Sequence, residues 1–318
     1  MSLLIEISDE YEPRVKEAVM AALVALQSRV TVQVITQTLE TLGVEGVVGL
    51  LQNFKDDLGP VINELDLAIR ESGISTVKMI PKAALTNPSF QFDMFSEHTA
   101  NYIRQYRLNL INQITEETRN AVRQSVLEGF QLGVNPRKTA RQIKDSLGLT
   151  PYQERAVRNY RKALEELDKN ALDRALRDKR FDRSFIAAMR NSKPLTPDQI
   201  DRMVQRYRER YIAYRAEVIA RTESMRAVSV GNRAAMQQML SSGAVDIDKV
   251  RRQWVYTHDN RTRNAHRGIP ELNKGGVRLD GEYKTSLGPL AYPRDPSGLP
   301  ENTIQCRCTE RYFIAEGV

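Results

Sequence analysis

Cysteine is almost absent from this chain of 318 residues, which contains two cysteines, three histidines and one tryptophan. Two cysteines cannot form a disulfide framework in a chain of this length, so we expect a protein that works in a reducing compartment. Both stand in the stretch NTIQCRC, as Cys306 and Cys308. This concentration makes residues 302–308 the first candidate for a functional or structural site.

Long hydrophobic runs and targeting signals are also missing. The longest apolar run, Ala18 to Leu26, is too short to cross a bilayer. The first residues, MSLLIEISDEYEPR, carry acids where a signal peptide carries positive charge. With 41% apolar and 27% charged residues, the composition is that of a globular protein. We therefore expect no membrane anchor, no targeting segment, and a cytoplasmic location in the cell that makes the protein.

The motifs of several common enzyme classes are absent. There is no His-Glu-x-x-His helix of a zinc protease, no Gly-x-x-x-x-Gly-Lys-Ser/Thr phosphate loop and no Gly-x-Ser-x-Gly elbow. A cysteine nucleophile remains an option on residue types, with His266 as its base and Asp259 to orient that histidine. Because this grouping is assembled across long sequence distances, we expect a protein that is not an enzyme.

Acidic and basic residues are distributed unevenly. Residues 1–100 carry 7 basic and 14 acidic side chains, whereas residues 101–318 carry 40 basic and 26 acidic ones. Within residues 137–220 there are 21 basic and 12 acidic side chains. Such a segment predicts contact with a polyanion, here double-stranded DNA without sequence preference. The equally weighted alternative is a set of solvated helix faces, where arginine serves solubility and ion pairing.

Helical periodicity covers most of the first 240 residues. Apolar residues recur at intervals of three and four over residues 14–72. The prolines and polar residues of 73–96 predict a linker. Ser96 is then the expected N-cap of an amphipathic helix of about 35 residues. A helix of this length needs a partner helix or a larger assembly to pack against.

Two further helix starts share one capping device. The motifs LTPYQ and LTPDQ each combine a threonine cap, a proline at the first helical position and a glutamine that completes a capping box. We therefore expect helices to begin after Thr150 and Thr196. Tyr207, Tyr211 and Tyr214 fall on the apolar stripe of the second helix and are expected in the core.

After Gly243, glycine and proline become frequent and short β-prone runs replace the helical pattern. Strands are expected at Trp254–Thr257 and Thr309–Ile314, with a hairpin over Val277–Lys284. The predicted fold is mainly α, with long amphipathic helices followed by a small C-terminal α+β domain. The expected regions are an acidic helical region (1–96), a basic long-helix body (97–240) and the α+β domain (241–318).

Histidine and cysteine coincide in the last seventy residues, which raises the question of a metal. His258, His266, Cys306 and Cys308 match the number and chemistry of the ligands of a tetrahedral zinc ion, and Asp259 is a reserve ligand. On a regular strand, however, alternate residues lie roughly 7 Å apart, so a shared ion requires a local bend. The alternatives are two cysteines that pack as small apolar groups, or a strained bond between them.

The segment from Asp259 to His266 also suits a structural role. An aspartate close to arginines favours bidentate ion pairs, and a buried histidine can hold a loop against a sheet. Arg221 and Glu223 can likewise connect the long helix to the small domain through arginine–carboxylate contacts. We therefore interpret these residues as a structural clasp.

Several residues occur in a characteristic order: Arg221 and Glu223 at the end of a long helix, Trp254, the motif Asp259-x-Arg261-x-Arg263-x-x-His266, and Arg307 between the two cysteines. This order resembles the minor head protein family named after protein F of bacteriophage Mu. The resemblance covers roughly residues 136–314, and Gln305 departs from it because family members often carry asparagine there.

The resemblance implies a tailed-phage head morphogenesis protein, a minor capsid protein present in few copies. Its expected place is the head interior at the portal vertex of the virion, and the host bacterial cytoplasm during assembly. The implied partners are the portal protein, the major capsid or scaffolding protein and DNA, with a role in head assembly and in DNA packaging or ejection. A metal-dependent nuclease or hydrolase that uses the His/Asp/Cys cluster is the alternative function.

Overall fold

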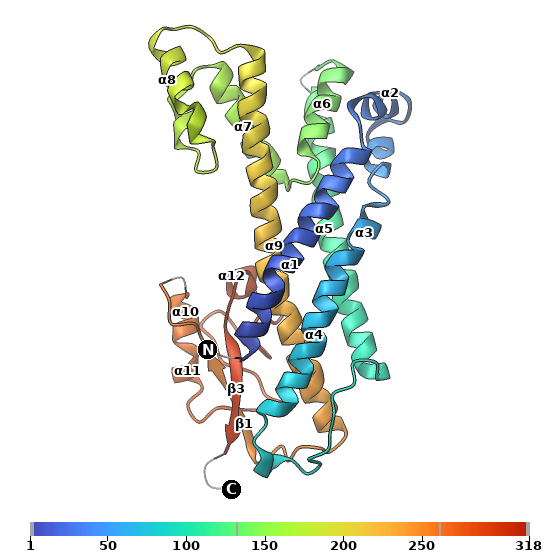
Figure 1. The fold of residues 1–318 in the computed structure, drawn as a ribbon, viewed down its shortest axis with the longest axis vertical. Coiled ribbons are helices and arrows are strands. Elements are labelled where there is room, and N and C mark those ends of the chain that lie inside the picture. The colour runs from blue at the N-terminus through green and yellow to red at the C-terminus, as the bar shows by residue number, and fades with distance from the viewer. Residues whose placement is uncertain (1–2, 132, 261, 316–318) are drawn as a thin grey trace. The chain divides into compact units, whose positions relative to one another are not determined.

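The chain is mainly helical and ends in a small sheet, which confirms the predicted fold class (Figure 1). The computed structural model describes residues 3–131, 133–260 and 262–315. The longer helices are α1 (Leu3–Arg29), α2 (Val32–Gly49), α4 (Gly59–Met79), α5 (Glu97–Gln131), α6 (Pro136–Ser146), α7 (Pro151–Glu165), α8 (Asp182–Arg190) and α9 (Pro197–Ser241). The short ones are α3 (Phe54–Asp57), η1 (Lys82–Ala84), η2 (Lys169–Asp173), η3 (Lys179–Phe181), α10 (Asn264–Arg267), α11 (Ile269–Leu272) and α12 (Pro300–Thr303).

Two compact units form, each from segments that are separated in the sequence. Unit 1 contains residues 1–16, 60–108 and 218–318, and unit 2 contains residues 17–59 and 109–217. Helices α1, α5 and α9 each contribute residues to both units. The regions predicted from the sequence (1–96, 97–240 and 241–318) are continuous in the chain, because they are divided where helical periodicity breaks. The two units are divided by packing, so long helices pass from one unit to the other.

In unit 1, α4 packs closely on the C-terminal part of α9. Ser72 donates a hydrogen bond from Oγ to the carbonyl oxygen of Val228 at 2.6 Å. A Cβ atom at Gly231 would lie 2.1 Å from the carbonyl oxygen of Ile69. Only glycine permits this approach of two backbones. The contact places the end of α9 next to the sheet, where Tyr312 donates to the Asn232 side chain at 2.7 Å.

The sheet of unit 1 is antiparallel in the order β2-β1-β3. Its strands are β1 (Val250–Val255), β2 (Val277–Arg278) and β3 (Thr309–Ile314). The third strand has the predicted bounds, whereas β1 begins four residues before the predicted strand. Residues 277–284 do not form the expected hairpin, because β2 pairs with β1 and the Gly281 amide closes a turn on the Arg278 carbonyl.

In unit 2, both predicted capping boxes are present. Thr150 accepts from the Gln153 amide and donates its own amide to the Gln153 side chain, and Thr196 and Gln199 repeat the arrangement. Arg215 of α9 is buried and donates to the Gly148 carbonyl at 2.9 Å. Arg215 thus lies in the core beside the apolar stripe and forms an ion pair with Glu117.

Three expectations about the helices are corrected. Helix α1 begins at Leu3 and continues through Pro13, which removes one hydrogen bond from its interior. Helix α4 continues to Met79, inside the predicted linker 73–96, because small buried residues such as Ser72 let it pack closely on α9. Tyr214 is 46% exposed, whereas Tyr207 is buried as predicted.

One stretch of the described residues, Val32–Met79, is long and apolar enough by composition to cross a membrane. The core helix of a soluble protein passes the same test, and the stretch is interrupted by a non-helical residue at Gly43 and by the segment between α2 and α4. We draw no membrane assignment from it.

Candidate functional site

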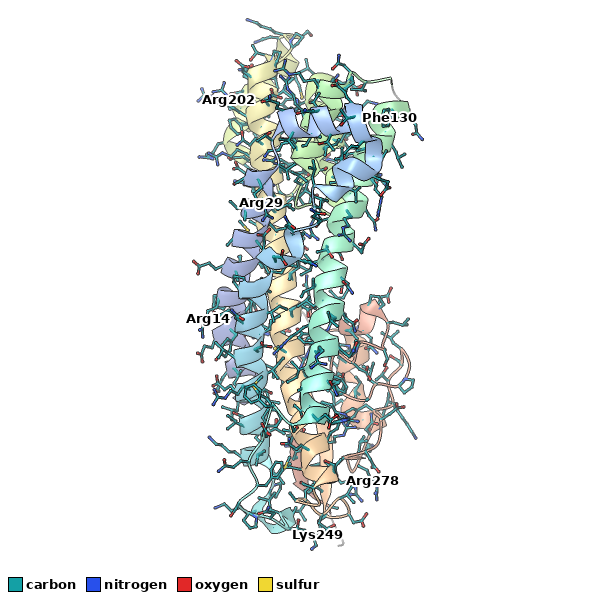
Figure 2. All side chains as sticks on the ribbon, turned by 90° about the vertical axis from the view of Figure 1, so that its right-hand side faces the viewer. Arg14, Arg29, Phe130, Arg202, Lys249 and Arg278 are labelled. Carbon is teal, nitrogen blue, oxygen red and sulfur yellow. The ribbon has the colours of Figure 1, made fainter. Side chains whose placement is uncertain are left out.

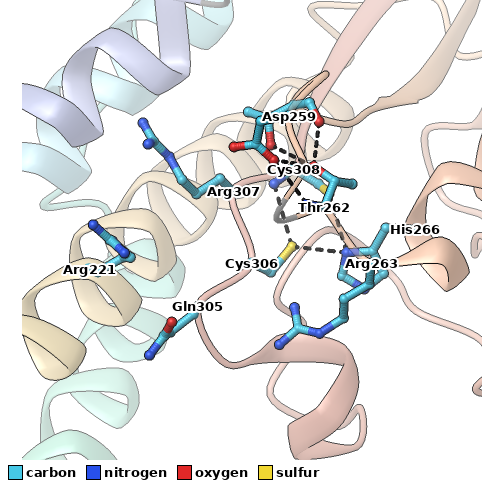
Figure 3. A pocket seen from close by; sticks show the side chains of 10 residues that line it. Arg221, Asp259, Thr262, Arg263, His266, Gln305, Cys306, Arg307 and Cys308 are labelled. Carbon is cyan, nitrogen blue, oxygen red and sulfur yellow. Dashed lines mark hydrogen bonds between the residues drawn. The ribbon is translucent and has the colours of Figure 1, made fainter. Parts of the chain in front are cut away.

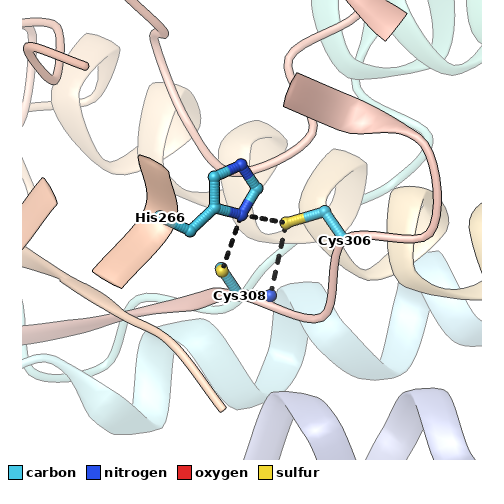
Figure 4. Close-up of side chains that lie close together, drawn as sticks. All are labelled: His266, Cys306 and Cys308. Atoms are coloured by element: carbon cyan, nitrogen blue, oxygen red, sulfur yellow. Dashed lines mark hydrogen bonds between the residues drawn. The ribbon is translucent and has the colours of Figure 1, made fainter. Parts of the chain in front are cut away.

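Unit 1 brings one histidine and both cysteines together. His266 lies on the short helix α10, and Cys306 and Cys308 lie in the segment between α12 and β3 (Figure 4). The Nδ1 atom of His266 is 3.6 Å from Cys306 Sγ and 3.4 Å from Cys308 Sγ. The three donor atoms all lie within 4.8 Å of one another, and the three residues are at most 2% exposed.

These distances fit a tetrahedral metal ion. With a zinc–nitrogen bond of about 2.05 Å and a zinc–sulfur bond of about 2.3 Å, the two donor atoms lie about 3.5 Å apart at the tetrahedral angle. Both nitrogen–sulfur distances are close to this value. His266, Cys306 and Cys308 can therefore hold one ion with little movement.

A local bend lets two alternate residues face the same point. Gln305 has φ 56°, in the left-handed region, and Cys308 donates its amide to Cys306 Sγ at 3.4 Å. Both cysteines precede the first residue of β3, so the separation expected on a regular strand does not apply. Asparagine adopts this conformation more readily than glutamine does. The departure at Gln305 therefore falls on a strained position.

The remaining nitrogen of His266 is held by an amide side chain. His266 Nε2 is 2.8 Å from Asn302 Oδ1, and Asn302 in turn donates to Thr285 Oγ1 at 3.3 Å. An amide oxygen only accepts, so Nε2 carries a proton, and in the neutral imidazole Nδ1 is then the nitrogen with the lone pair for a metal. Trp254 packs edge-on against the imidazole, with ring centroids 5.7 Å apart. Metal-binding histidines typically donate their second ring nitrogen to a polar group, as His266 does to Asn302.

The same contacts set the protonation of the group. The hydrogen bond from Cys308, followed by those of His266 and the charge of Arg294, holds the pKa of Cys306 well below its usual range despite burial. The side-chain hydrogen bond between Cys308 and Cys306, together with burial, raises the pKa of Cys308. Burial lowers the pKa of His266, but its contacts with Cys306 and Asn302 outweigh this and raise it. Negative charge is therefore stabilised on Cys306, in the form that binds metals.

A cavity of about 170 Å³ opens beside this group (Figure 3). Its lining contains all three members of the group together with Arg221, Thr257, Asp259, Thr262, Arg263, Gln305 and Arg307. Five of the eight residues that carry the resemblance thus meet in one place, from three separate stretches of chain. Trp254 packs directly behind them, against His266.

The arginines of the cavity have different partners. Arg221 forms an ion pair with Glu12 at 3.3 Å, and Arg307 pairs with Asp9. Arg263 donates to the carbonyl oxygen of Ile304 at 2.6 Å. Both carboxylates come from α1, in the N-terminal region for which the sequence suggests no role.

Three predicted site residues lie elsewhere or cannot be placed. Glu223 accepts from Tyr106 at 2.9 Å and pairs with Arg226 at 2.7 Å, so it holds α5 and α9 together instead of lining the cavity. His258 stacks near Tyr256, with centroids 4.5 Å apart, and is not a member of the three-residue group. Arg261 lies outside the described residues. The group therefore offers three ligand atoms where the sequence predicts four.

The carboxylate of Asp259 is fixed by its own loop. Thr262 donates to Asp259 Oδ1 from its amide at 2.9 Å and from its hydroxyl at 3.0 Å. Asp259 lines the cavity but is not in the group of candidate ligands. Its position suits a base or a hydrogen-bond acceptor at the cavity wall more than a direct ligand.

Two residues of the site were not predicted. Asn302 opens the NTIQCRC stretch but has no sequence feature that identifies it as the partner of His266. Arg294 is 1% exposed and donates to the carbonyl oxygens of Cys306 and Cys308 and to Ser229. One arginine among 47 basic residues carries no signal of burial.

Comparison with known proteins identifies no relative of this chain: no family model, no curated protein and no solved structure matches it. The resemblance to the phage head proteins therefore stays a prediction.

Proposed function

We propose that the protein is a minor capsid protein of a tailed bacteriophage, placed in the head interior at the portal vertex and not itself an enzyme. One observation supports this most: Arg221, Asp259, Arg263, His266 and Arg307, which carry the resemblance, line one cavity. These five residues are spread over almost ninety positions of the sequence, so their convergence in space supports the resemblance. The expected roles are head assembly and DNA packaging or ejection, with the portal and the major capsid or scaffolding protein as partners.

Non-specific DNA binding is part of this proposal, and unit 2 offers a surface for it. A hollow of about 420 Å³ is lined by Arg180, Arg202 and Arg206, together with Phe181, Gln205 and Glu209. Arg202 projects from α9 (Figure 2), and Arg180 is 75% exposed even though it pairs with Asp178. Exposed guanidinium groups bind phosphates without reading bases, so the affinity should fall steeply with salt.

Purified phage particles provide the first test of the proposal. Mass spectrometry of intact virions should detect the chain in few copies. The isolated protein should bind duplex DNA of unrelated sequences with equal affinity at low salt. Absence from virions, together with no affinity for the portal or for DNA, would contradict the proposal.

The metal belongs to the same proposal. We infer that His266, Cys306 and Cys308 hold a zinc ion, which ties α10 to the segment before β3. The ion would cross-link two stretches about forty residues apart and close the C-terminal region as a clasp. The two nitrogen–sulfur distances, the proton on Nε2 and the stabilised thiolate all fit this ion.

Elemental analysis tests this inference with a matched pair of variants. His266→Ala should reduce bound zinc from about one equivalent to near zero, because two ligands hold zinc poorly. His258→Ala removes an exposed histidine outside the group and should leave zinc bound. Equal zinc content in both variants, or none in the unaltered protein, would contradict the metal assignment.

A metal-dependent hydrolase is the second candidate, and the cavity favours it. Structural zinc sites usually have four protein ligands, whereas catalytic sites have three and an open position. A bound zinc ion would supply an activated water, and Asp259 could accept its proton at the cavity wall. Hydrolysis of DNA or a phosphate ester that stops with a chelator and with Asp259→Asn would support an enzyme. No hydrolysis with any divalent metal would leave the structural role.

A further inference from the structure

We propose that the cavity beside His266, Cys306 and Cys308 binds a phosphate-class oxyanion, with one oxygen at the open position of the metal and the others on arginine side chains. This inference rests on the proposed zinc and names the ligand of that site. It holds whether the zinc is structural or catalytic.

The open position is the first argument. Tetrahedral zinc takes four ligands, and the described residues provide three. All three ligand residues line the cavity, and Asp259 is held by Thr262 instead of joining them. The fourth ligand must therefore enter through the cavity, from solvent.

Charge is the second argument. Two thiolates neutralise a zinc ion, but Arg294 adds a positive charge that is fully buried, 3.2 Å from the Cys306 carbonyl. Among the described residues no carboxylate forms a salt bridge with Arg294. The cavity wall adds three arginines and one aspartate. With Glu12 and Asp9, which pair with Arg221 and Arg307, these groups amount to four positive and three negative charges. The site therefore keeps a net positive charge, which favours an anion over a second cation.

The arginines themselves are the third argument. Arg221 and Arg307 each use one guanidinium nitrogen in the contact with Glu12 or Asp9, so each keeps further N–H donors for a ligand. Arg263 binds a single backbone carbonyl, at Ile304, which leaves most of its donors for a ligand. In the view of Figure 3, Arg221 and Arg307 lie on one side of Cys306 and Arg263 on the other.

Hydrogen bonding distinguishes phosphate from sulfate, an anion of similar size. The cavity of about 170 Å³ has room for one small tetrahedral anion. Asp259 would repel an oxyanion without a proton. Phosphate near pH 7 retains a P–OH group, which can donate to Asp259, whereas sulfate has no proton to donate. The site should therefore prefer phosphate to sulfate.

Cobalt substitution tests the proposal directly. Co²⁺ in place of zinc gives thiolate-to-metal charge-transfer bands when the metal binds, and visible bands that shift when a fourth ligand changes. Titration of the Co²⁺ protein with inorganic phosphate should shift the visible bands with saturation, and sulfate should bind more weakly. Arg263→Gln should weaken phosphate binding about tenfold, equivalent to about 1.4 kcal/mol. Arg311→Gln, an exposed arginine of β3 outside the cavity, should leave it unchanged.

The outcomes separate this inference from the metal assignment. Charge-transfer bands that appear but do not respond to phosphate would overturn the anion site and leave the metal intact. Absence of these bands would overturn both. A phosphate response that Arg263→Gln and Arg311→Gln weaken equally would show adventitious binding and would also overturn the proposal.

Discussion

The buried ion pair between Arg252 and Glu310 gives a sharp test of how the sheet of unit 1 is stabilised. Arg252 Nη1 and Glu310 Oε1 are 2.8 Å apart, and their side chains are 2% and 4% exposed. Tyr283 also donates to Glu310 Oε1, at 3.0 Å. Among these contacts, Glu310 is the only negative charge next to the buried guanidinium of Arg252, and Glu310→Ala removes it. We expect a loss of about 3–5 kcal/mol in the free energy of unfolding, the range for breaking a buried pair from one side.

Fluorescence of the single tryptophan can report this loss locally. Trp254 lies directly opposite Glu310 in the β1–β3 register and is buried, so it senses the sheet itself. This matters because a chain with two units need not unfold in one step. Urea unfolding followed at Trp254 should show a lower midpoint for Glu310→Ala.

An exposed pair on the same sheet is the matched control. Asp248 and Arg278 are 2.8 Å apart, but their side chains are 69% and 46% exposed. Asp248→Ala should cost less than about 1 kcal/mol, because water screens the pair. Replacement of both buried partners, Arg252→Met with Glu310→Leu, should recover most of the stability. Equal costs for Glu310→Ala and Asp248→Ala would refute the reasoning.

Three further changes have definite expected outcomes. Gln305→Asn should raise the free energy of unfolding by a few tenths to about 1 kcal/mol in urea unfolding, because asparagine tolerates the φ of 56° better; a loss would contradict strain at this residue. Burial raises the pKa of Glu154 from 4.5 to about 7, so its contribution to stability is complete below about pH 4.5 and is lost as the pH rises through about 7. Glu154→Gln should therefore stabilise unit 2 by about 1–3 kcal/mol at pH 8 and much less at pH 5. Urea unfolding followed by circular dichroism at the two pH values measures this, and an equal gain at both would rule out titration as the cause. Asn302→Leu should lower metal affinity roughly 10- to 100-fold in chelator competition, because His266 loses the contact that orients it; unchanged affinity would count against the metal.

Local signals in the sequence predicted the helices well. The helix after Ser96 begins at Glu97, and the capping boxes at Thr150 and Thr196 form as expected. These features depend on residues a few positions apart, so the sequence contains the whole interaction. Strand β3 was predicted for the same reason, from a short β-prone run.

Contacts between distant segments were predicted less well. The prediction of a hairpin at 277–284 was wrong because β2 pairs with β1, a strand outside this segment. Tyr214 is exposed although its place on the apolar stripe predicts burial, and its neighbour Arg215 is buried. Arg215 can be buried because it finds carbonyl and carboxylate partners on α5 and the loop before α7. Periodicity assigns a face to each residue, but the partners on that face decide which side chain can be buried.

The sequence by itself determined the class of the fold, the starts of α5, α7 and α9 and the chemical types of a metal group, because these depend on local pattern and composition. It also identified His266, Cys306 and Cys308 as candidate metal ligands. Only the tertiary structure decided that Cys306 and Cys308 face one nitrogen of His266, that Asn302 holds the other, and that His258 stays apart. The bend at Gln305 made the difference: a single left-handed residue turns two alternate side chains toward one point, and no regular spacing predicts it.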